Sequence, residues 1–320
     1  MTHKSKEEQQ KLLQLLKQAV GNDIPQLTDE YFLQFLVANA WDVHGAQRQL
    51  QETLAWRKEN DIDSIPVATN SNKLPLLLSV RGYKYVQDGD LGVHPGLSTT
   101  TLKIGSLIGG DCFHKFDKEG HPILIDRTGY HNSKALGNEL TSEQITNYQV
   151  ACQEFVGRVI MKESSERLQR IIHRETVIFD CSNMGIRQFH MNALYHLKAV
   201  ADIVQHYYPE TLHRLFIINA PSAFVMMWKV IRPWLNPGTL DKVQILGKDF
   251  KNVLLEHIDA ENLPDFLGGT CTCDQMPGGC VPIRSEGSLL NPTDANEQVS
   301  TVYNTDIMEA ASTNRSLCQL

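Results

Sequence analysis

The feature that most constrains the fold is a change in the spacing of apolar residues near residue 113. Up to about residue 60, apolar residues recur at intervals of three and four, which is typical of amphipathic helices. From Phe113 onward, short apolar runs alternate with longer helical patterns, as in α/β layer structures. The runs expected to form strands are Ile123–Asp126, Thr176–Asp180, Leu215–Asn219 and Lys242–Leu246. The sequence therefore predicts a small helical unit followed by an α/β lobe.

Helix-start signals support this division. A first amphipathic helix is predicted over residues 6–20, and Thr28 and Asp42 are suitable N-caps for the next two helices. In the lobe, the capping-box sequence Thr141-Ser-Glu-Gln144 is expected to begin a long helix that continues through Val159. Further lobe helices are predicted over residues 190–206, 222–235 and 249–257. The long spacers between the apolar runs are thus helical.

The domain boundaries follow from these patterns. Residues 1–65 are predicted to form the helical unit, and residues 66–111 a connecting segment that mixes Pro, Gly, Ser and Asn with short apolar patches. The α/β lobe is expected to span residues 112–280. Apolar density falls beyond Gly269, and residues 281–320 are predicted to be a disordered tail.

Charge and cysteine content restrict the compartment and the partners. The first residues are charged and no apolar span of about 20 residues occurs, so we expect a cytoplasmic protein. The seven cysteines are expected to be reduced thiols in that compartment. The formal net charge of −7 opposes nucleic-acid binding and gives no general attraction to anionic membranes. Any contact with a membrane surface should therefore be local.

The sequence lacks the common catalytic frameworks. It contains no Gly-x-Ser-x-Gly elbow, no phosphate-binding Gly-x4-Gly-Lys-Ser/Thr loop, no Gly-x-Gly-x-x-Gly and no His-Glu-x-x-His. Cys271, Cys273 and Cys280 offer three thiolates, but no fourth ligand stands at a usual spacing, so free thiols are expected and a metal site is not. An enzyme and a resident cofactor are accordingly not predicted.

The unusual segment is residues 224–235, where only Lys229 and Arg232 interrupt apolar residues around the whole helix. Such a helix needs apolar partners on more than one side. One interpretation is a fully buried core helix. The other is an element that lies between an internal apolar cavity and a membrane, for which Met- and Trp-rich surfaces are suited.

Ordered motifs between Thr28 and Gly269 decide between these interpretations. They are Trp41-Asp-Val43, Leu54-Ala-Trp-Arg-Lys-Glu-Asn-Asp-Ile-Asp63, Asp117-Lys-Glu-Gly-His-Pro122, Ile178-Phe-Asp-Cys-Ser182, Tyr207-Tyr-Pro-Glu-Thr211, Phe216-Ile-Ile-Asn-Ala-Pro221, Pro233-Trp-Leu-Asn-Pro237, Ala260-Glu-Asn-Leu-Pro264 and Phe266-Leu-Gly-Gly269. With these motifs the chain resembles the CRAL-TRIO family of SEC-fourteen-like phosphatidylinositol transfer proteins and their tocopherol-binding relatives.

The resemblance implies a mixed β-sheet that floors an apolar lipid pocket, beside a helical N-terminal domain. Residues 224–235 then correspond to the family's mobile gate helix, with lipid or membrane contacts expected from Phe224, Met227, Trp228, Ile231 and Trp234. The apolar runs supply the expected floor residues Ile123, Ile125, Val177, Phe179, Phe216 and Ile218, for which an ordinary core role is equally consistent.

The resemblance also implies a headgroup site. The positions that meet the inositol headgroup in phosphoinositide-binding members correspond to Glu210, Thr239 and Lys242. The family's phosphate-contacting Arg corresponds to Asn39, and the Ser/Thr pair associated with choline lipids falls at Glu175 and Val177. The ligand therefore stays open between phosphatidylinositol and a neutral lipid such as tocopherol.

The expected function is that of a cytoplasmic, transiently membrane-associated protein that extracts one lipid from a membrane and carries or presents it. The bound lipid would be its ligand, without a cofactor. The alternative is an interaction module of the same fold that binds a small GTPase or another signalling partner without transferring lipid.

Overall fold

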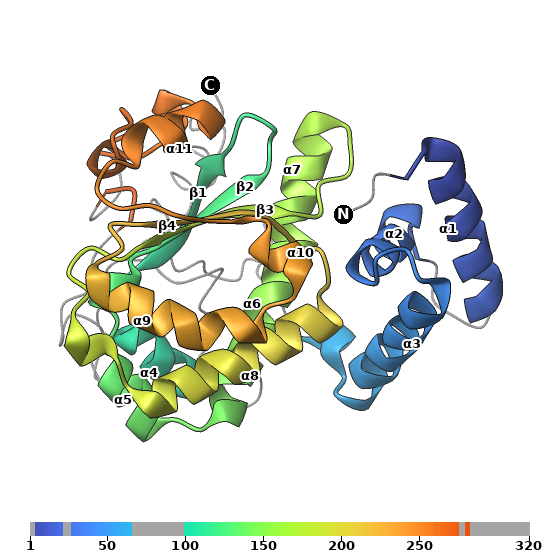
Figure 1. Cartoon of the computed structure of the whole chain (residues 1–320), viewed down its shortest axis with the longest axis horizontal. Helices are drawn as coiled ribbons and strands as arrows, with labels where there is room; N and C mark the ends of the chain where they lie inside the picture. Colours follow the sequence, from blue (N-terminus) through green and yellow to red (C-terminus); the bar gives the residue numbers. More distant parts are fainter. Residues whose placement is uncertain (1–3, 22–26, 66–98, 275–278, 282–320) are drawn as a thin grey trace, which may run out of the picture.

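The computed structural model describes residues 4–21, 27–65, 99–274 and 279–281, and the fold begins with three helices (Figure 1). These are α1 (Lys6–Val20), α2 (Asp29–Ala38) and α3 (Val43–Glu59). Their N-caps are Ser5, Thr28 and Asp42, whose side chains accept hydrogen bonds from the backbone of the first turn. The helices enclose a small core of their own, formed by Leu13, Leu16, Phe32, Phe35, Leu36, Ala46 and Leu50. The predicted helical unit is confirmed.

A five-stranded mixed sheet forms the centre of the second part. Its strands are β1 (Asp111–Phe116), β2 (Pro122–Asp126), β3 (Glu175–Asp180), β4 (Leu212–Ile218) and β5 (Val243–Ile245), in the order β1-β2-β3-β4-β5. β1 pairs antiparallel with β2, and the remaining pairs are parallel. The four predicted strands are confirmed, whereas the edge strand β1 was not predicted.

The parallel strands are joined by segments that contain helices, because strands that run in the same direction need a crossover connection. The lobe helices are α4 (Thr99–Leu107), α5 (Ser133–Glu139), α6 (Ser142–Phe155), α7 (Met161–Leu168), α8 (Met191–Tyr207), α9 (Ser222–Ile231), α10 (Pro237–Leu240) and α11 (Lys251–His257). The predicted capping box at Thr141 and Gln144 is present. α6 continues as the π-helical turn Val156–Ile160, so the predicted long helix changes its winding before it ends.

The helix predicted over residues 222–235 is shorter than expected. α9 ends at Ile231 and the chain continues as a tight 3-10 turn, Arg232–Trp234. Pro233 explains the change, since proline has no N–H to donate and its ring clashes with the preceding turn of an α-helix.

The two faces of the sheet carry different helices. In Figure 1, α8 and α9 lie on one side of the sheet and α11 lies on the other. α11 and the segment that follows it pack on the β2, β3 and β4 side chains Ile123, Ile125, Ile178, Phe216 and Ile218. On the opposite face, Phe179, Leu215, Ile217 and Val243 contact α8 and α9. The register places residues of one face in line across the parallel strands, as the two-residue period of a strand requires.

The helical unit docks on the lobe through α3. The Trp56 ring stacks on Tyr207 with 4.0 Å between ring centroids and an interplanar angle of 9°. Beside this stack, Arg57 makes a two-pronged ion pair with Glu154 of α6, with N–O distances of 2.9 and 3.0 Å. Glu154 also accepts a hydrogen bond from Tyr208 at 2.8 Å.

Parts of the predicted domain division fall outside the described residues. The connecting segment 66–111 is described only from residue 99, where it forms α4 and the start of β1. The predicted tail, residues 281–320, lies outside the described residues except for Val281. These two boundaries stay predictions.

Candidate functional site

Helix α9 has an inward side that packs on the sheet. Phe224 and Met227 are buried there, and Trp228, Ile231 and Trp234 are half-buried in the same cluster. All five predicted gate residues therefore lie together, and they face Leu194 of α8 and the β4 side chains. Met227 is only 8% exposed, so as the structure stands it contacts the lobe interior and not the solvent.

The outward side of α9 is also apolar. Val225, Met226 and Val230 are 53%, 59% and 44% exposed. On α8, Met191, Tyr195 and Leu197 are exposed as well. We call these six residues the α8/α9 apolar surface. Sequence reasoning named the helix but not these residues, because a helix apolar all round gives no signal for which side faces the protein.

The structure divides the predicted floor residues between the two faces of the sheet. Val177 and Phe179 lie on the face that carries α9, in line with Leu124, Leu215 and Ile217. The other four, Ile123, Ile125, Phe216 and Ile218, are fully buried under α11. The expectation that all six share one floor is therefore wrong. Residues two apart in one strand do share a face, but Val177 and Phe179 of β3 align with Leu124 of β2 and with Leu215 and Ile217 of β4, so they point to the opposite face from the other four.

The predicted headgroup residues meet at the edge of the sheet where the parallel strands begin. Lys242 Nζ lies 2.8 Å from Glu210 Oε2. The backbone N–H of Lys242 donates to the Thr239 carbonyl at 3.0 Å, so Thr239 lies in the turn that leads into Lys242. Glu210 has a left-handed φ of 59°, and this sharp turn directs the Tyr-Pro-Glu segment into β4.

Arg174 is a fourth member that sequence reasoning missed. Its guanidinium lies 2.8 Å from the same Glu210 oxygen and also donates to the Glu210 carbonyl at 3.2 Å. Arg174 directly precedes β3, so its position could have been inferred: the first residues of adjacent parallel strands share one sheet edge. We call Arg174, Glu210, Thr239 and Lys242 the strand-start cluster.

The strand-start cluster carries one more positive than negative charge, from two cations and one carboxylate. Burial lowers the pKa of Lys242, while its hydrogen bond to Glu210 acts in the opposite direction. Burial also lowers the pKa of the adjacent His173 to about 4, with a further contribution from Arg174. His173 is thus neutral at physiological pH, and the positive charge available to an anionic ligand comes from Arg174 and Lys242.

Residues 109–269, half of the chain, match the family model of the CRAL/TRIO domain. The chain belongs to the CRAL/TRIO domain family. It is 32% identical over 286 residues to the phosphatidylinositol/phosphatidylcholine transfer protein SFH12 of Arabidopsis thaliana, covering 88% of this chain and 46% of that protein. It is 28% identical over 283 residues to the SEC14 cytosolic factor of Eremothecium gossypii, covering 88% and 82%. The chain thus spans about half the length of the plant relative.

A solved structure supports the fold. The crystal structure of Sfh5 aligns with 78% of this chain and 84% of its own, with a TM-score of 0.52 and 14% sequence identity. The order of a helical N-terminal region and a mixed five-stranded sheet with helices is therefore that of the CRAL/TRIO family. Within the described ranges, none of the helices has the length and apolar character needed to cross a membrane.

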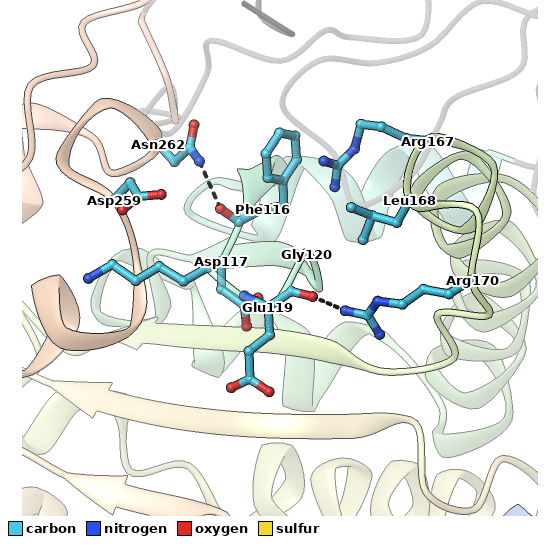
Figure 2. A pocket seen from close by; sticks show the side chains of 10 residues that line it. Phe116, Asp117, Glu119, Gly120, Arg167, Leu168, Arg170, Asp259 and Asn262 are labelled. Carbon is cyan, nitrogen blue, oxygen red and sulfur yellow. Dashed lines mark hydrogen bonds between the residues drawn. The ribbon is translucent and has the colours of Figure 1, made fainter.

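The CRAL/TRIO lobe also carries a polar cleft of about 360 Å³ (Figure 2). It is formed around the β1–β2 turn by Phe116–Gly120, with Arg167 and Arg170 on one side and Asp259 and Asn262 on the other. The Arg167 guanidinium lies 3.5 Å from the centre of the Phe116 ring, and Asn262 donates to the Phe116 carbonyl at 3.2 Å. These contacts show a braced turn, and none of the gate, floor or headgroup residues lines the cleft.

Two groups of side chains have donor atoms close enough to hold a metal ion. In the first, Asp117 lies near His121 and His213. The Asp117 carboxylate already accepts hydrogen bonds from the Glu119 and His121 backbone and from the Thr176 hydroxyl. Its oxygens are therefore occupied in bracing the turn. The second group consists of His114, Cys271, Cys273 and Cys280, so its donor atoms are sulfur and nitrogen without a carboxylate.

Proposed function

We propose that this protein binds a single phospholipid, phosphatidylinositol in particular, and moves it between membranes. Helix α9 carries the proposal, because it is apolar on both sides: one side packs on the sheet and the other is exposed. A lipid held between α9 and the sheet would replace Phe224, Met227 and Trp228 as the partner of Phe179, Leu215 and Ile217. The exposed side of α9 would contact the membrane while the exchange takes place.

The energetic requirement supports an apolar chain site at this place. A lipid leaves its bilayer only if the protein solvates its chains equally well. At ~0.8 kcal/mol for each CH₂, about 30 methylenes need on the order of 25 kcal/mol. The gate-helix face of the sheet offers a continuous apolar surface for this purpose, from Leu124, Val177, Phe179, Leu215 and Ile217.

The strand-start cluster is the proposed headgroup site. Its net positive charge suits one phosphate, which Lys242 and Arg174 would receive in charge-assisted hydrogen bonds. Glu210 can accept hydrogen bonds from sugar hydroxyls, and the Thr239 hydroxyl can donate or accept. Arg174 offers a second cation, which Asn39 cannot supply because its amide is uncharged. The Asn39 amide also already donates to the Phe35 carbonyl and to Gln49. This favours phosphatidylinositol over a neutral lipid.

The test is lipid extraction followed by transfer. Protein purified from cells should release about one lipid for each chain, identified by mass spectrometry. In a competition assay, labelled phosphatidylinositol, phosphatidylcholine and tocopherol are offered in vesicles, and movement to acceptor vesicles is measured. No extracted lipid together with no uptake from vesicles would contradict the proposal and favour an interaction module.

A substitution at Lys242 tests the headgroup site separately from lipid transfer as a whole. A charge-assisted hydrogen bond is worth ~1.5 to 3 kcal/mol, so Lys242→Ala should weaken phosphatidylinositol binding by about ten- to a hundredfold. Glu210 keeps Arg174 as its partner in this variant, so the fold should survive. Lys248→Ala, at an exposed position after β5, is the matched control. Equal phosphatidylinositol transfer by the wild type and Lys242→Ala would show that the strand-start cluster does not bind the headgroup.

A further inference from the structure

Three cysteines near the end of the lobe converge with one histidine from its edge strand. Cys271, Cys273 and Cys280 follow the segment that matches the family, and His114 lies in β1. One donor atom of each, three sulfurs and an imidazole nitrogen, lie within 4.8 Å of one another. The sequence offered no fourth ligand at a usual spacing because the fourth ligand comes from a distant strand. We propose that these residues form a structural zinc site.

The spacing of the donor atoms fits a tetrahedral ion. Zn–S bonds of about 2.3 Å and Zn–N bonds of about 2.0 Å place the ligand atoms of a tetrahedron roughly 3.5 to 3.8 Å apart. The Sγ atoms of Cys271 and Cys273 are 3.5 Å apart. The remaining distances, up to 4.8 Å, need a contraction of about 1 Å that side-chain rotation can supply.

The imidazole is the second observation that points to a ligand. His114 is only 6% exposed, and its Nε2 atom is buried without a hydrogen-bond partner in the described part of the chain. Buried polar atoms are nearly always paired, so this nitrogen requires an explanation. A zinc ion bound by His114 and the three cysteine sulfurs would give the buried imidazole a coordination partner.

The scaffold fixes the ligands from both sides. The Cys271 N–H donates to the Leu263 carbonyl at 3.1 Å, and the Cys271 carbonyl accepts from the Asp265 N–H at 2.9 Å. A Cβ at Gly269 would lie 1.9 Å from the Leu263 carbonyl oxygen, so only glycine permits this approach. On the other side, the β1–β2 ladder is irregular between Phe113 and Phe116, and such bulges redirect side chains.

The donor set selects the metal and the role. Three thiolates and one imidazole are a common set for structural zinc, and four protein ligands leave no open position for catalysis. Three free thiols are the alternative, but they leave the buried Nε2 atom of His114 without a hydrogen-bond partner among the described residues. A disulfide would use two of the three cysteines, and it would leave the third thiol free and the buried Nε2 atom of His114 without a partner among the described residues. The proposed ion would tie the C-terminal end of the lobe to β1 and close the core under α11.

The first measurement is metal content. The full chain, purified under reducing conditions without chelator, should contain about one zinc per chain by elemental mass spectrometry. Cys273→Ser, Cys280→Ser and His114→Asn should each lower the content about tenfold or more. Cys181→Ala, which replaces another buried free thiol outside the cluster, should keep it. Zinc retained equally in all four variants, or absent from the wild type, would overturn the proposal.

Two further measurements cover variants that fail to fold. Exchange of the wild-type ion for Co²⁺ should give visible ligand-field bands of tetrahedral geometry and thiolate-to-cobalt charge transfer. A strong chelator should lower the thermal midpoint of the wild type and make Cys271, Cys273 and Cys280 reactive toward a thiol reagent. Octahedral cobalt spectra, or the loss of two thiols to a disulfide in protein kept reduced, would contradict a zinc site. Lipid transfer is measured separately, so its failure does not bear on this result.

Discussion

At the junction between the helical unit and the lobe, one buried carboxylate meets several partners. Glu154 is 3% exposed and pairs with Arg57, whereas Asp63, the second acidic partner of Arg57, is 76% exposed. Burial raises the pKa of Tyr208 above its usual value, and the charge of Glu154 adds to this, so the phenol stays a hydrogen-bond donor. Glu154 is therefore the buried acceptor for both Arg57 and Tyr208 at this junction.

Removing that carboxylate tests the junction. Because loss of Glu154 leaves the largely buried Arg57 with only the exposed Asp63 as its acidic partner, Glu154→Gln should lower the free energy of unfolding by about 3 kcal/mol. Urea unfolding with an unchanged slope would measure it. Asp63→Asn removes the exposed partner of the same Arg57 and should cost less than about 1 kcal/mol. Similar losses in both variants would show that the burial of Glu154 is not what matters.

A second residue prediction concerns pH. His173 has a pKa of about 4 in the folded protein because it is buried, against about 6.5 in an unfolded chain. Between these values the unfolded chain binds a proton that the folded chain does not, so the free energy of unfolding should fall as the pH falls from 6.5 towards 4. His173→Gln should show a shallower fall in urea titrations at several pH values. His44→Gln, at an exposed position in α3, should retain the wild-type slope.

At the scale of elements, helix α9 allows a test of membrane docking. Met226 and Val230 face outward, so Met226→Asp with Val230→Asp should leave the packing on the sheet intact. Burying an apolar side chain is worth about 1.5 to 3 kcal/mol, so the double variant should bind vesicles at least about tenfold more weakly. Binding by the wild type should change little with salt, since the attraction is hydrophobic.

The matched control for docking is Ile171→Asp, an exposed apolar residue between α7 and β3, outside the α8/α9 apolar surface. Vesicle binding by this variant should equal that of the wild type in a flotation assay. Loss of wild-type binding in high salt alone would instead indicate docking by charge.

The elements also show what a sequence can predict. Capping residues such as Thr28, Asp42 and Thr141 located helices to the residue, because a cap is a local hydrogen bond. β1 was missed because Asp111, His114 and Lys115 interrupt its apolar pattern, and its bulge places a left-handed residue, Lys115, within the strand. The alternation of side chains within each strand could be predicted from the sequence. Which of the two faces meets α9 depends on how neighbouring strands align, and the sequence of one strand does not contain that information.

The candidate sites also show that local signals can be read from the sequence whereas contacts between distant strands cannot. Glu210, Thr239 and Lys242 were named from a family resemblance, whereas Arg174 became visible only when the strand starts were aligned. His114 could not be assigned to the cysteines from the sequence, because the contact depends on the antiparallel pairing of β1 with β2 and on the return of the chain after α11. Long-range pairing is the information that local spacing lacks.

At the scale of the whole molecule, Gln205 connects the helical unit, α8 and the end of the gate helix. Its side chain donates to the Trp234 carbonyl at 2.9 Å and accepts from the Asn236 N–H at 2.7 Å, just beyond α9. Its own carbonyl accepts from Gln49 of α3 at 3.2 Å. A single residue thus holds the chain after α9 against α8, at the place where the helical unit also docks.

If α9 moves to admit a lipid, these two side-chain bonds must break. Each is worth about 0.5 to 1.5 kcal/mol, so Gln205→Ala should raise the rate of lipid release about five- to a hundredfold, because the closed arrangement loses both bonds. Stopped-flow release of a fluorescent phospholipid into excess acceptor vesicles measures the rate. Gln49→Ala, which removes the contact from the helical unit but leaves both bonds to the gate segment, should have a smaller effect. An unchanged release rate in Gln205→Ala would mean that lipid leaves without movement of the segment after α9. A larger effect of Gln49→Ala would place the controlling step at the docking of the helical unit.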